Sequence, residues 1–316
     1  MTTPVHGVYL SDMLDLDALY GDALAALGPD VVLHRPEDVR DPDAIRFAIC
    51  WLPGAGAFAR FPGIELAMSI GAGVDALLTH PGVGPDTQIA RVRDPYQASL
   101  MAGFAVHEVL HVRRGFDAMA RNAARAEWRP PALTSPDATT IAVLGDGTMG
   151  RAVSVALRQL GFDVRIACRS VPQTPAAGCR YFTGPEAVAQ AAEGAHVLIN
   201  VLPLTAATEN VLDAALFARL ARGAWLVQIG RGEHLVEADL TAALAAGYLA
   251  GASLDVFRTE PLPADHPFWR DDRLRITPHV ASDSIPEVVA RQVVETAREL
   301  AEGRPLTLGI DRARGY

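Results

Sequence analysis

Short apolar runs alternate with segments of helical periodicity along almost the whole chain. Apolar runs of strand length occur in both halves of the sequence: Val5–Leu10, Val31–His34, Ile45–Trp51, Leu66–Ile70, Gln88–Val92, Thr140–Leu144, Val164–Cys168, Val197–Leu202, Ala224–Ile229, Ala250–Val256 and Leu274–Thr277. Strands that are separated by helices pair in parallel through βαβ units. The pattern therefore predicts an α/β protein with two doubly wound parallel sheets.

The connection between the two predicted sheets divides the chain. Spacing from Tyr96 to about Arg125 predicts one long helix, and a Pro-rich polar stretch, 128–137, follows it. A last amphipathic helix is expected from Pro286 to about Glu302, with a tail too short to form a domain. We expect one domain of residues 1–98 plus 284–316 and a second of residues 99–283.

Charge and composition exclude several classes of function. All 28 basic residues are arginine, so chemistry that needs a lysine amine, such as Schiff-base catalysis or a Walker nucleotide site, is excluded. The net charge of −9 and the scattered arginines argue against nucleic acid or a membrane surface as partner. Any bound anion must be held by arginine or by backbone amides.

The three cysteines and the lack of targeting segments point to a reducing compartment. Cys50, Cys168 and Cys179 are odd in number and lack a C-x-x-C spacing, so neither disulfides nor a zinc ribbon are expected. The first residues lack a basic, apolar leader, and no apolar run approaches the ~20 residues of a membrane span. We expect a cytoplasmic protein.

A glycine-rich segment directly follows the strand that ends at Leu144. Gly145-Asp-Gly-Thr-Met-Gly150 fits G-x-G-x-x-G and opens a helix expected to run through Leu160. In this setting the glycines allow a tight turn, close approach of a pyrophosphate and close helix–strand packing. The segment predicts a dinucleotide site that includes Gly145, Gly147, Thr148, Met149 and Gly150.

The next strand lacks the acidic residue that would bind the ribose 2′-hydroxyl of NAD. It ends in Ala167-Cys-Arg-Ser170, and Asp163 precedes the strand, at its wrong end. Because arginine and a hydroxyl suit a 2′-phosphate, Arg169 and Ser170 favour NADP(H), with NAD(H) possible. A solvated surface arginine is the alternative for Arg169.

Three polar residues follow neighbouring strands of the second sheet, where ligands of such sheets bind. Arg231 follows the strand 224–229, Glu260 the strand 250–256 and His279 the strand 274–277. A guanidinium suits a carboxylate and a developing alkoxide, and an imidazole can transfer a proton. A carboxylate beside the imidazole stabilises its protonated form, so the three residues together predict a site for ketone reduction.

Several segments together resemble the D-isomer-specific 2-hydroxyacid dehydrogenases. They are Gly71-Ala-Gly-Val-Asp75, the 145–150 loop, Asn200-Val-Leu-Pro-Leu-Thr205, Gly230-Arg-Gly-Glu-His-Leu-Val-Glu237, Leu254-Asp-Val-Phe-x-x-Glu-Pro-Leu262 and Thr277-Pro-His-Val280. The Trp51 segment, the Arg169-Ser170 pair and the terminal Asp311-Arg-Ala-Arg-Gly-Tyr316 resemble the glyoxylate/hydroxypyruvate reductases within that family.

The resemblance implies a function and a role for each site residue. It implies reduction of small 2-keto acids, glyoxylate or hydroxypyruvate, in a cleft between the two domains, by a homodimer. Arg231 would bind the substrate, His279 would deliver the proton, and Glu260 would pair with His279. The Gly73 and Val74 amides would hold the substrate carboxylate, and Trp51 would line its pocket. Asp255 would bind the nicotinamide carboxamide, and the cofactor would also contact Leu202, Pro203 and Ile229.

The chain departs from the resembled family at Asp146, inside the glycine loop, and at Gly103, where relatives often carry Glu. A negative charge at position 146 is expected to weaken cofactor binding.

Three alternatives remain open at this point. His107-Glu-Val-Leu-His111 is a literal H-E-x-x-H zinc motif, although no third ligand is evident, and no metal site is expected. The enzyme could act on another 2-hydroxyacid, of the phosphoglycerate or D-lactate type. A dinucleotide-sensing corepressor on the same fold is the alternative outside enzymes.

Overall fold

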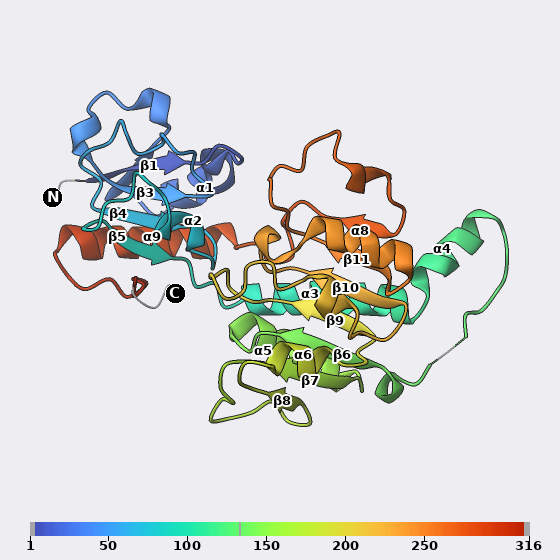
Figure 1. Ribbon diagram of the computed structural model, residues 1–316. Helices are drawn as coiled ribbons and strands as arrows, with labels where there is room; N and C mark the ends of the chain where they lie inside the picture. The colour runs from blue at the N-terminus through green and yellow to red at the C-terminus, as the bar shows by residue number, and fades with distance from the viewer. Residues whose placement is uncertain (1–3, 133, 313–316) are drawn as a thin grey trace. The chain divides into compact units, whose positions relative to one another are not determined.

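The computed structural model describes residues 4–132 and 134–312, which form two compact units (Figure 1). One unit comprises residues up to Tyr96 together with those from Asp283 onward, and the other runs from Gln97 to Ser282. Each unit contains one parallel sheet, so the predicted α/β fold with two parallel sheets is confirmed. No helix in the described part of the chain is long and apolar enough to span a membrane.

The first unit is built on a five-stranded parallel sheet in the order β2-β1-β3-β4-β5. Its strands are β1 (Val5–Leu10), β2 (Val31–His34), β3 (Ile45–Cys50), β4 (Leu66–Ser69) and β5 (Gln88–Arg91). Its helices are α1 (Leu16–Ala25), α2 (Asp75–Leu78) and α9 (Pro286–Ala301). The apolar face of α9 packs with α1 into one core cluster, which attaches the end of the chain to the first sheet.

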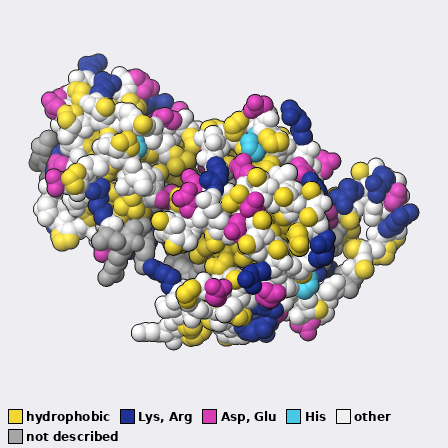
Figure 2. Space-filling model, in the orientation of Figure 1, with side chains coloured by type: hydrophobic (Ala, Val, Ile, Leu, Met, Phe, Trp, Pro, Cys, Tyr) yellow, Lys and Arg dark blue, Asp and Glu magenta, His cyan; other side chains and the backbone are white. Residues whose placement is uncertain are grey.

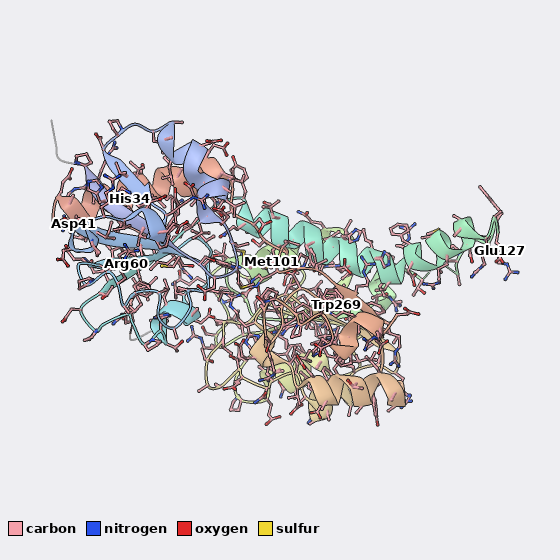
Figure 3. All side chains as sticks on the ribbon, turned by 90° about the horizontal axis from the view of Figure 1, so that it is seen from above. His34, Asp41, Arg60, Met101, Glu127 and Trp269 are labelled. Carbon is pink, nitrogen blue, oxygen red and sulfur yellow. The ribbon has the colours of Figure 1, made fainter. Side chains whose placement is uncertain are left out.

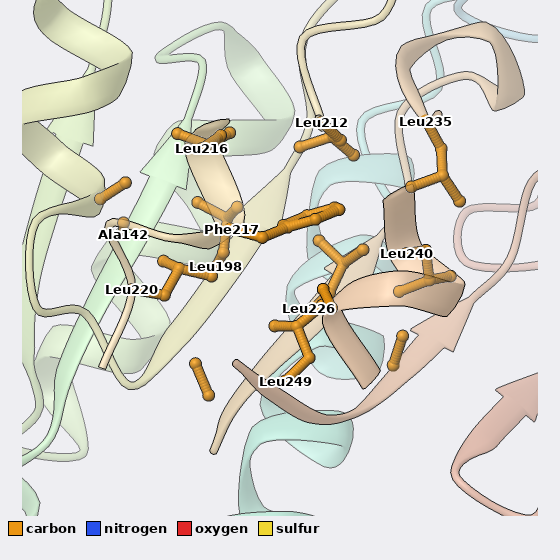
Figure 4. Close-up of a cluster of buried hydrophobic side chains, with 14 of the residues drawn as sticks. Ala142, Leu198, Leu212, Leu216, Phe217, Leu220, Leu226, Leu235, Leu240 and Leu249 are labelled. Atoms are coloured by element: carbon orange, nitrogen blue, oxygen red, sulfur yellow. The ribbon is translucent and has the colours of Figure 1, made fainter. Parts of the chain in front are cut away.

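The second unit is built on a seven-stranded parallel sheet in the order β12-β11-β10-β9-β6-β7-β8. Its strands are β6 (Thr140–Leu144), β7 (Asp163–Ala167), β8 (Arg180–Phe182), β9 (Val197–Asn200), β10 (Ala224–Gln228), β11 (Leu249–Leu254) and β12 (Leu274–Ile276). Its helices are α3 (Gln97–Arg113), α4 (Phe116–Ala124), α5 (Thr148–Gln159), α6 (Ala187–Ala192), α7 (Ala214–Phe217) and α8 (Glu237–Ala246). Leu198, Phe217, Leu226 and Leu240 are fully buried in one of its cores (Figure 4).

Two features of the second unit differ from the sequence-based expectation. The single long helix expected from Tyr96 to about Arg125 is wrong, because Gly115 adopts a left-handed conformation (φ 65°) and separates α3 from α4. The strand β8 was not predicted, since its three residues, Arg180–Phe182, are half-buried or exposed and include a surface arginine.

Candidate functional site

The carboxyl ends of the strands of the second sheet bring most candidate residues to one edge. The order of the sheet reverses between β6 and β9, and ligands of doubly wound sheets bind beside such a switch point. The glycine loop follows β6, and Leu202 and Pro203 follow β9. Ile229 and Arg231 follow β10, Asp255 and Glu260 follow β11, and His279 follows β12. The topology therefore places these residues along one edge of a single sheet.

The glycine loop has a conformation suited to a phosphate group. Gly145 has φ 108°, and its amide donates to Ala167 O (2.9 Å). A Cβ at position 150 would collide with Gly145 O, so only glycine allows α5 to approach the loop this closely. Gly147 is the N-cap residue that precedes α5, and a Cβ at that position would meet no atom within 4 Å. The loop is thus closely packed at Gly150. Around Gly147, next to the N-terminus of α5, there is open space.

The Arg169-Ser170 pair lies at the end of β7, as the sequence indicates. Both residues are exposed, and the Cys168 thiol donates to Ser170 O (3.3 Å). Asp163 lies at the opposite end of β7, where Arg180 and Thr140 bind its carboxylate. It therefore lies at the wrong end of the sheet to bind a ribose at the glycine loop.

A buried polar network holds the backbone of Arg231. Asn200, Gln228 and His234 are completely buried, and Asn200 Nδ2 donates to Gln228 Oε1 (2.8 Å). The Arg231 amide donates to His234 Nδ1 (3.0 Å), so Nε2 carries the ring proton and donates to Pro203 O (3.3 Å). Gln228 Nε2 donates to Arg231 O (2.7 Å). The network thus fixes the 200–203 and 230–234 segments together.

The sequence analysis assigned no role to these three network residues. Two of them, Asn200 and Gln228, could have been found from the sequence, because they are polar residues at the ends of apolar strand runs. A close approach of the chain also fixes the Arg231 segment, because a Cβ at Gly232 would collide with the Phe257 backbone. The Arg231 guanidinium donates to Gly230 O (2.8 Å).

His279 and Glu260 form an ion pair whose two members are each held in place. Their Nδ1 and Oε2 atoms lie 2.8 Å apart, and the side chains are only 21% and 12% exposed. The other oxygen of Glu260 accepts from the Phe257 amide (2.9 Å). His279 has φ 58°, an uncommon conformation for a non-glycine residue and one that is typical of functional sites.

Asp255 holds the segment that carries His279. Its carboxylate accepts from Thr277 Oγ1 (2.6 Å) and from the amides of Val280 and Ala281 (both 2.9 Å). Its own carbonyl oxygen accepts from the His279 amide (2.8 Å). Asp255 is therefore a positioning residue for the histidine, and its expected contact with the nicotinamide remains a prediction.

In the first unit, the 71–74 loop follows β4. Ser69 Oγ donates to Gly73 O (2.7 Å), and Arg91 donates to Ala72 O (2.9 Å). The amides of Gly73 and Val74 donate to no other group within residues 4–132 and 134–312. Trp51 is half-buried against the core of this unit, and its ring lies against Gly71. The loop is therefore fixed through its carbonyl oxygens, and binding of a substrate carboxylate by its two amides remains a prediction.

The H-E-x-x-H segment on α3 binds an arginine. Glu108 is 2% exposed, and its carboxylate accepts from Arg275 Nε (2.7 Å) and from Ser253 Oγ (2.5 Å). The Arg275 guanidinium also lies 3.1 Å from His111 Nε2 and 3.4 Å from His107 Nε2. A guanidinium thus lies where the two histidines of a zinc protease would bind the metal, and its charge repels a cation.

These contacts explain the protonation states around Glu108. Burial opposes ionisation, but hydrogen bonds from Arg275 and Ser253 outweigh it and lower the pKa of Glu108. Burial and the neighbouring Arg275 lower the pKa of His111. The Glu108–Arg275 pair therefore links α3 to β12 as a structural ion pair.

We expect Arg275→Met to lower the free energy of unfolding by about 3–5 kcal/mol, because it leaves the buried Glu108 carboxylate unpaired. Arg273→Met removes the more exposed pair with Asp271 from the same segment and should cost no more than ~1 kcal/mol. Urea denaturation at neutral pH measures both losses. Equal losses in the two variants would contradict a structural role for the buried pair.

Comparison with known proteins identifies the family. Residues 106–281 match the family model described as D-isomer specific 2-hydroxyacid dehydrogenase, NAD binding domain. The chain belongs to this family. The resemblance stated from the sequence motifs is confirmed, and with it the prediction of an NAD(P)-dependent 2-hydroxyacid dehydrogenase.

Relatives and solved structures cover nearly the whole chain. Glyoxylate/hydroxypyruvate reductase A of Serratia proteamaculans is 39% identical over 287 residues, which are 89% of this chain and 90% of the relative. A dehydrogenase of the family from Xanthobacter autotrophicus Py2, solved with NADPH and MES, is 36% identical, with TM-score 0.86 over 99% of this chain and 100% of that one. An NADPH-dependent glyoxylate/hydroxypyruvate reductase from Sinorhizobium meliloti, solved with NADP and sulfate, is 29% identical, with TM-score 0.87 over 98% and 99% of the two chains.

Proposed function

We propose that this protein reduces small 2-keto acids with NADPH, converting glyoxylate to glycolate and hydroxypyruvate to D-glycerate. The observation that carries the proposal is the His279–Glu260 pair, whose Nδ1 and Oε2 atoms lie 2.8 Å apart. Arg231, Glu260 and His279 follow β10, β11 and β12, three consecutive strands of the sheet. The names of the Serratia and Sinorhizobium relatives support the substrate class.

The glycine loop and the end of β7 fit NADP(H). The space above Gly147, at the start of α5, accommodates a pyrophosphate, and Thr148 and Met149 supply the first turn of that helix. Arg169 and Ser170 suit the 2′-phosphate, so NADP(H) is preferred and NAD(H) is possible. Leu202, Pro203 and Ile229 line the same sheet edge. NADPH and NADP in the Xanthobacter and Sinorhizobium structures support this assignment.

The residues of this chain then have distinct tasks in the reaction. When bound, NADPH supplies the hydride for the keto carbon. Arg231 binds the substrate carboxylate and stabilises negative charge on the keto oxygen. His279 protonates that oxygen, and its pairing with Glu260 through Nδ1 assigns the transferred proton to Nε2. Substrate contacts of Gly73, Val74 and Trp51, in the first unit, stay a prediction from the sequence.

A panel of 2-keto acids, each assayed with NADPH and with NADH, tests the function. We expect kcat/KM to be highest for glyoxylate and hydroxypyruvate and higher with NADPH. Equal or better efficiency with NADH would refute the cofactor preference. A preference for a phosphoglycerate or D-lactate type substrate would replace the substrate class. Binding of NADPH without turnover of any acid would support a corepressor instead.

The proposal includes a homodimer in the cytoplasm, formed through the second unit. α4 has no buried residue, and in Figure 3 this helix and the following segment up to Glu127 extend away from the rest of their unit. Apolar and basic side chains lie along it in Figure 2, and Trp128 is 98% exposed. A second chain would cover such a surface. Sedimentation should give twice the chain mass of 33.6 kDa, and Trp128→Asp should weaken association. A monomer at micromolar concentration would contradict the dimer.

The proposed cytoplasmic location agrees with the three cysteines, which are free thiols, as expected in a reducing compartment.

A further inference from the structure

Asp146, the acidic residue inside the glycine loop, has an unusual environment. Both carboxylate oxygens are buried, and neither has a hydrogen-bond partner within residues 4–132 and 134–312. Buried carboxylates are normally paired or hydrogen-bonded, because an isolated buried charge is costly. Burial accordingly raises the pKa of Asp146.

The groups that face Asp146 place it on one side of the loop. The hydroxyl of Tyr181 on β8 lies nearby but binds the Ala176 amide (2.9 Å) and makes no hydrogen bond of normal geometry to Asp146. Arg151 on α5 attracts the carboxylate, although its guanidinium is bonded to Thr174 O (2.5 Å). The thiols of Cys168, after β7, and Cys179, before β8, are also within electrostatic range.

Because Cys168, Cys179 and Tyr181 come from β8 and from the segments next to β7 and β8, the Asp146 carboxylate lies on the side of the glycine loop that faces these two strands. In a dinucleotide-binding sheet, the ribose that carries the 2′-substituent binds between the glycine loop and the end of the next strand. That strand is β7, which is followed by Arg169 and Ser170. The unpartnered carboxylate thus lies within the part of the site where NADP and NAD differ. Its buried oxygens act on a ligand through charge, without a direct hydrogen bond.

We propose that Asp146 determines cofactor discrimination, with the ionised carboxylate opposing the 2′-phosphate and so reducing the preference for NADPH over NADH. This inference rests on the proposed function, since it needs the dinucleotide to bind at this loop. A 2′-phosphate carries close to two negative charges above pH ~6 and is repelled more strongly than a hydroxyl. Arg169 attracts the phosphate and Asp146 repels it, so the preference reflects the difference between the two.

A dependence on pH follows from linkage. A bound 2′-phosphate disfavours the ionised carboxylate, so binding of NADPH raises the proton affinity of Asp146 and takes up protons. At low pH the carboxyl group is neutral, and Asp146 does not oppose the 2′-phosphate. As pH rises and Asp146 ionises, its contribution lowers the preference for NADPH relative to that of an uncharged side chain at the same position.

The test measures dissociation constants of NADPH and NADH by calorimetry at pH 5.0 and 8.5, without substrate. We expect Asp146→Asn to increase the ratio of the NADH constant to the NADPH constant about tenfold at pH 8.5, and by less at pH 5.0. Titration of the 2′-phosphate changes the ratio of dissociation constants equally in the wild type and in Asp146→Asn, so it cancels when the two ratios are compared at one pH. Asp272→Asn, which removes an exposed charge near the start of β12, is the matched control and should leave the ratio unchanged.

The outcomes separate this inference from the proposed function. If the wild-type protein binds neither dinucleotide, the proposed cofactor site is wrong, and the inference fails with it. If it binds both and the ratio for Asp146→Asn stays within twofold of wild type at both values of pH, only the inference is overturned. Thermal unfolding of the apo protein checks that the variant folds; Asp146→Ala, with a smaller side chain, replaces it if it does not.

Discussion

Arg231→Ala should lower kcat/KM for glyoxylate by about a thousandfold, because the substrate loses both a bidentate carboxylate contact and stabilisation of charge on its reacting oxygen. The buried Asn200–Gln228–His234 network holds the Arg231 backbone, not its side chain, so the loop should keep its conformation in the variant. Steady-state kinetics at saturating NADPH measure the loss. The dissociation constant of NADPH should stay within a few-fold of wild type.

Two further variants make this result specific. Arg231→Lys keeps the positive charge but loses the planar fork, and it should recover only a small part of the activity. Arg222→Ala removes an arginine that precedes β10, at the opposite end of that strand, where it donates to Ala246 O (2.5 Å), and it should leave kcat/KM nearly unchanged. If Arg231→Ala retains a tenth or more of wild-type kcat/KM, the proposed substrate anchor is wrong.

The fold was largely predictable because burial dictates the strand residues. β1 and β6 have the expected bounds, since a strand that is mostly buried reads as a continuous apolar run between turns. The prediction failed where burial is weak. β8 has no buried residue, and the break between α3 and α4 depends on the left-handed conformation of Gly115.

The strand-end positions of the candidate residues and the pairing of Glu260 with His279 were expected from the sequence, but the hydrogen bonds that hold this pair in place were not. The rule that ligands bind at the carboxyl ends of parallel strands selected Arg231, Glu260 and His279. The pairing distance of His279 and Glu260, and the backbone conformation of His279, depend on hydrogen bonds to Asp255 and Phe257. Contacts between segments that are distant along the chain have no periodic signal, and the role of Arg275 beside Glu108 was missed for this reason.

His279→Ala should lower kcat for keto-acid reduction by about a hundredfold to ten-thousandfold, the usual contribution of a general acid. KM should change much less, because the proposed substrate anchor, Arg231, is kept. Hydride transfer with deuterated NADPH separates this loss from slow product release. A variant with near-normal kcat would remove His279 from the proposed mechanism.

Glu260→Gln tests the pairing without removing the acid. The amide can still accept a hydrogen bond from His279 Nδ1, so the ring should stay oriented, but it no longer stabilises the imidazolium electrostatically. Because His279 must carry the proton that it delivers, kcat/KM should fall about tenfold, while the dissociation constant of NADPH stays within a few-fold of wild type. An unchanged kcat/KM would mean that Glu260 acts only on the backbone of Phe257, whose amide it also binds at 2.9 Å.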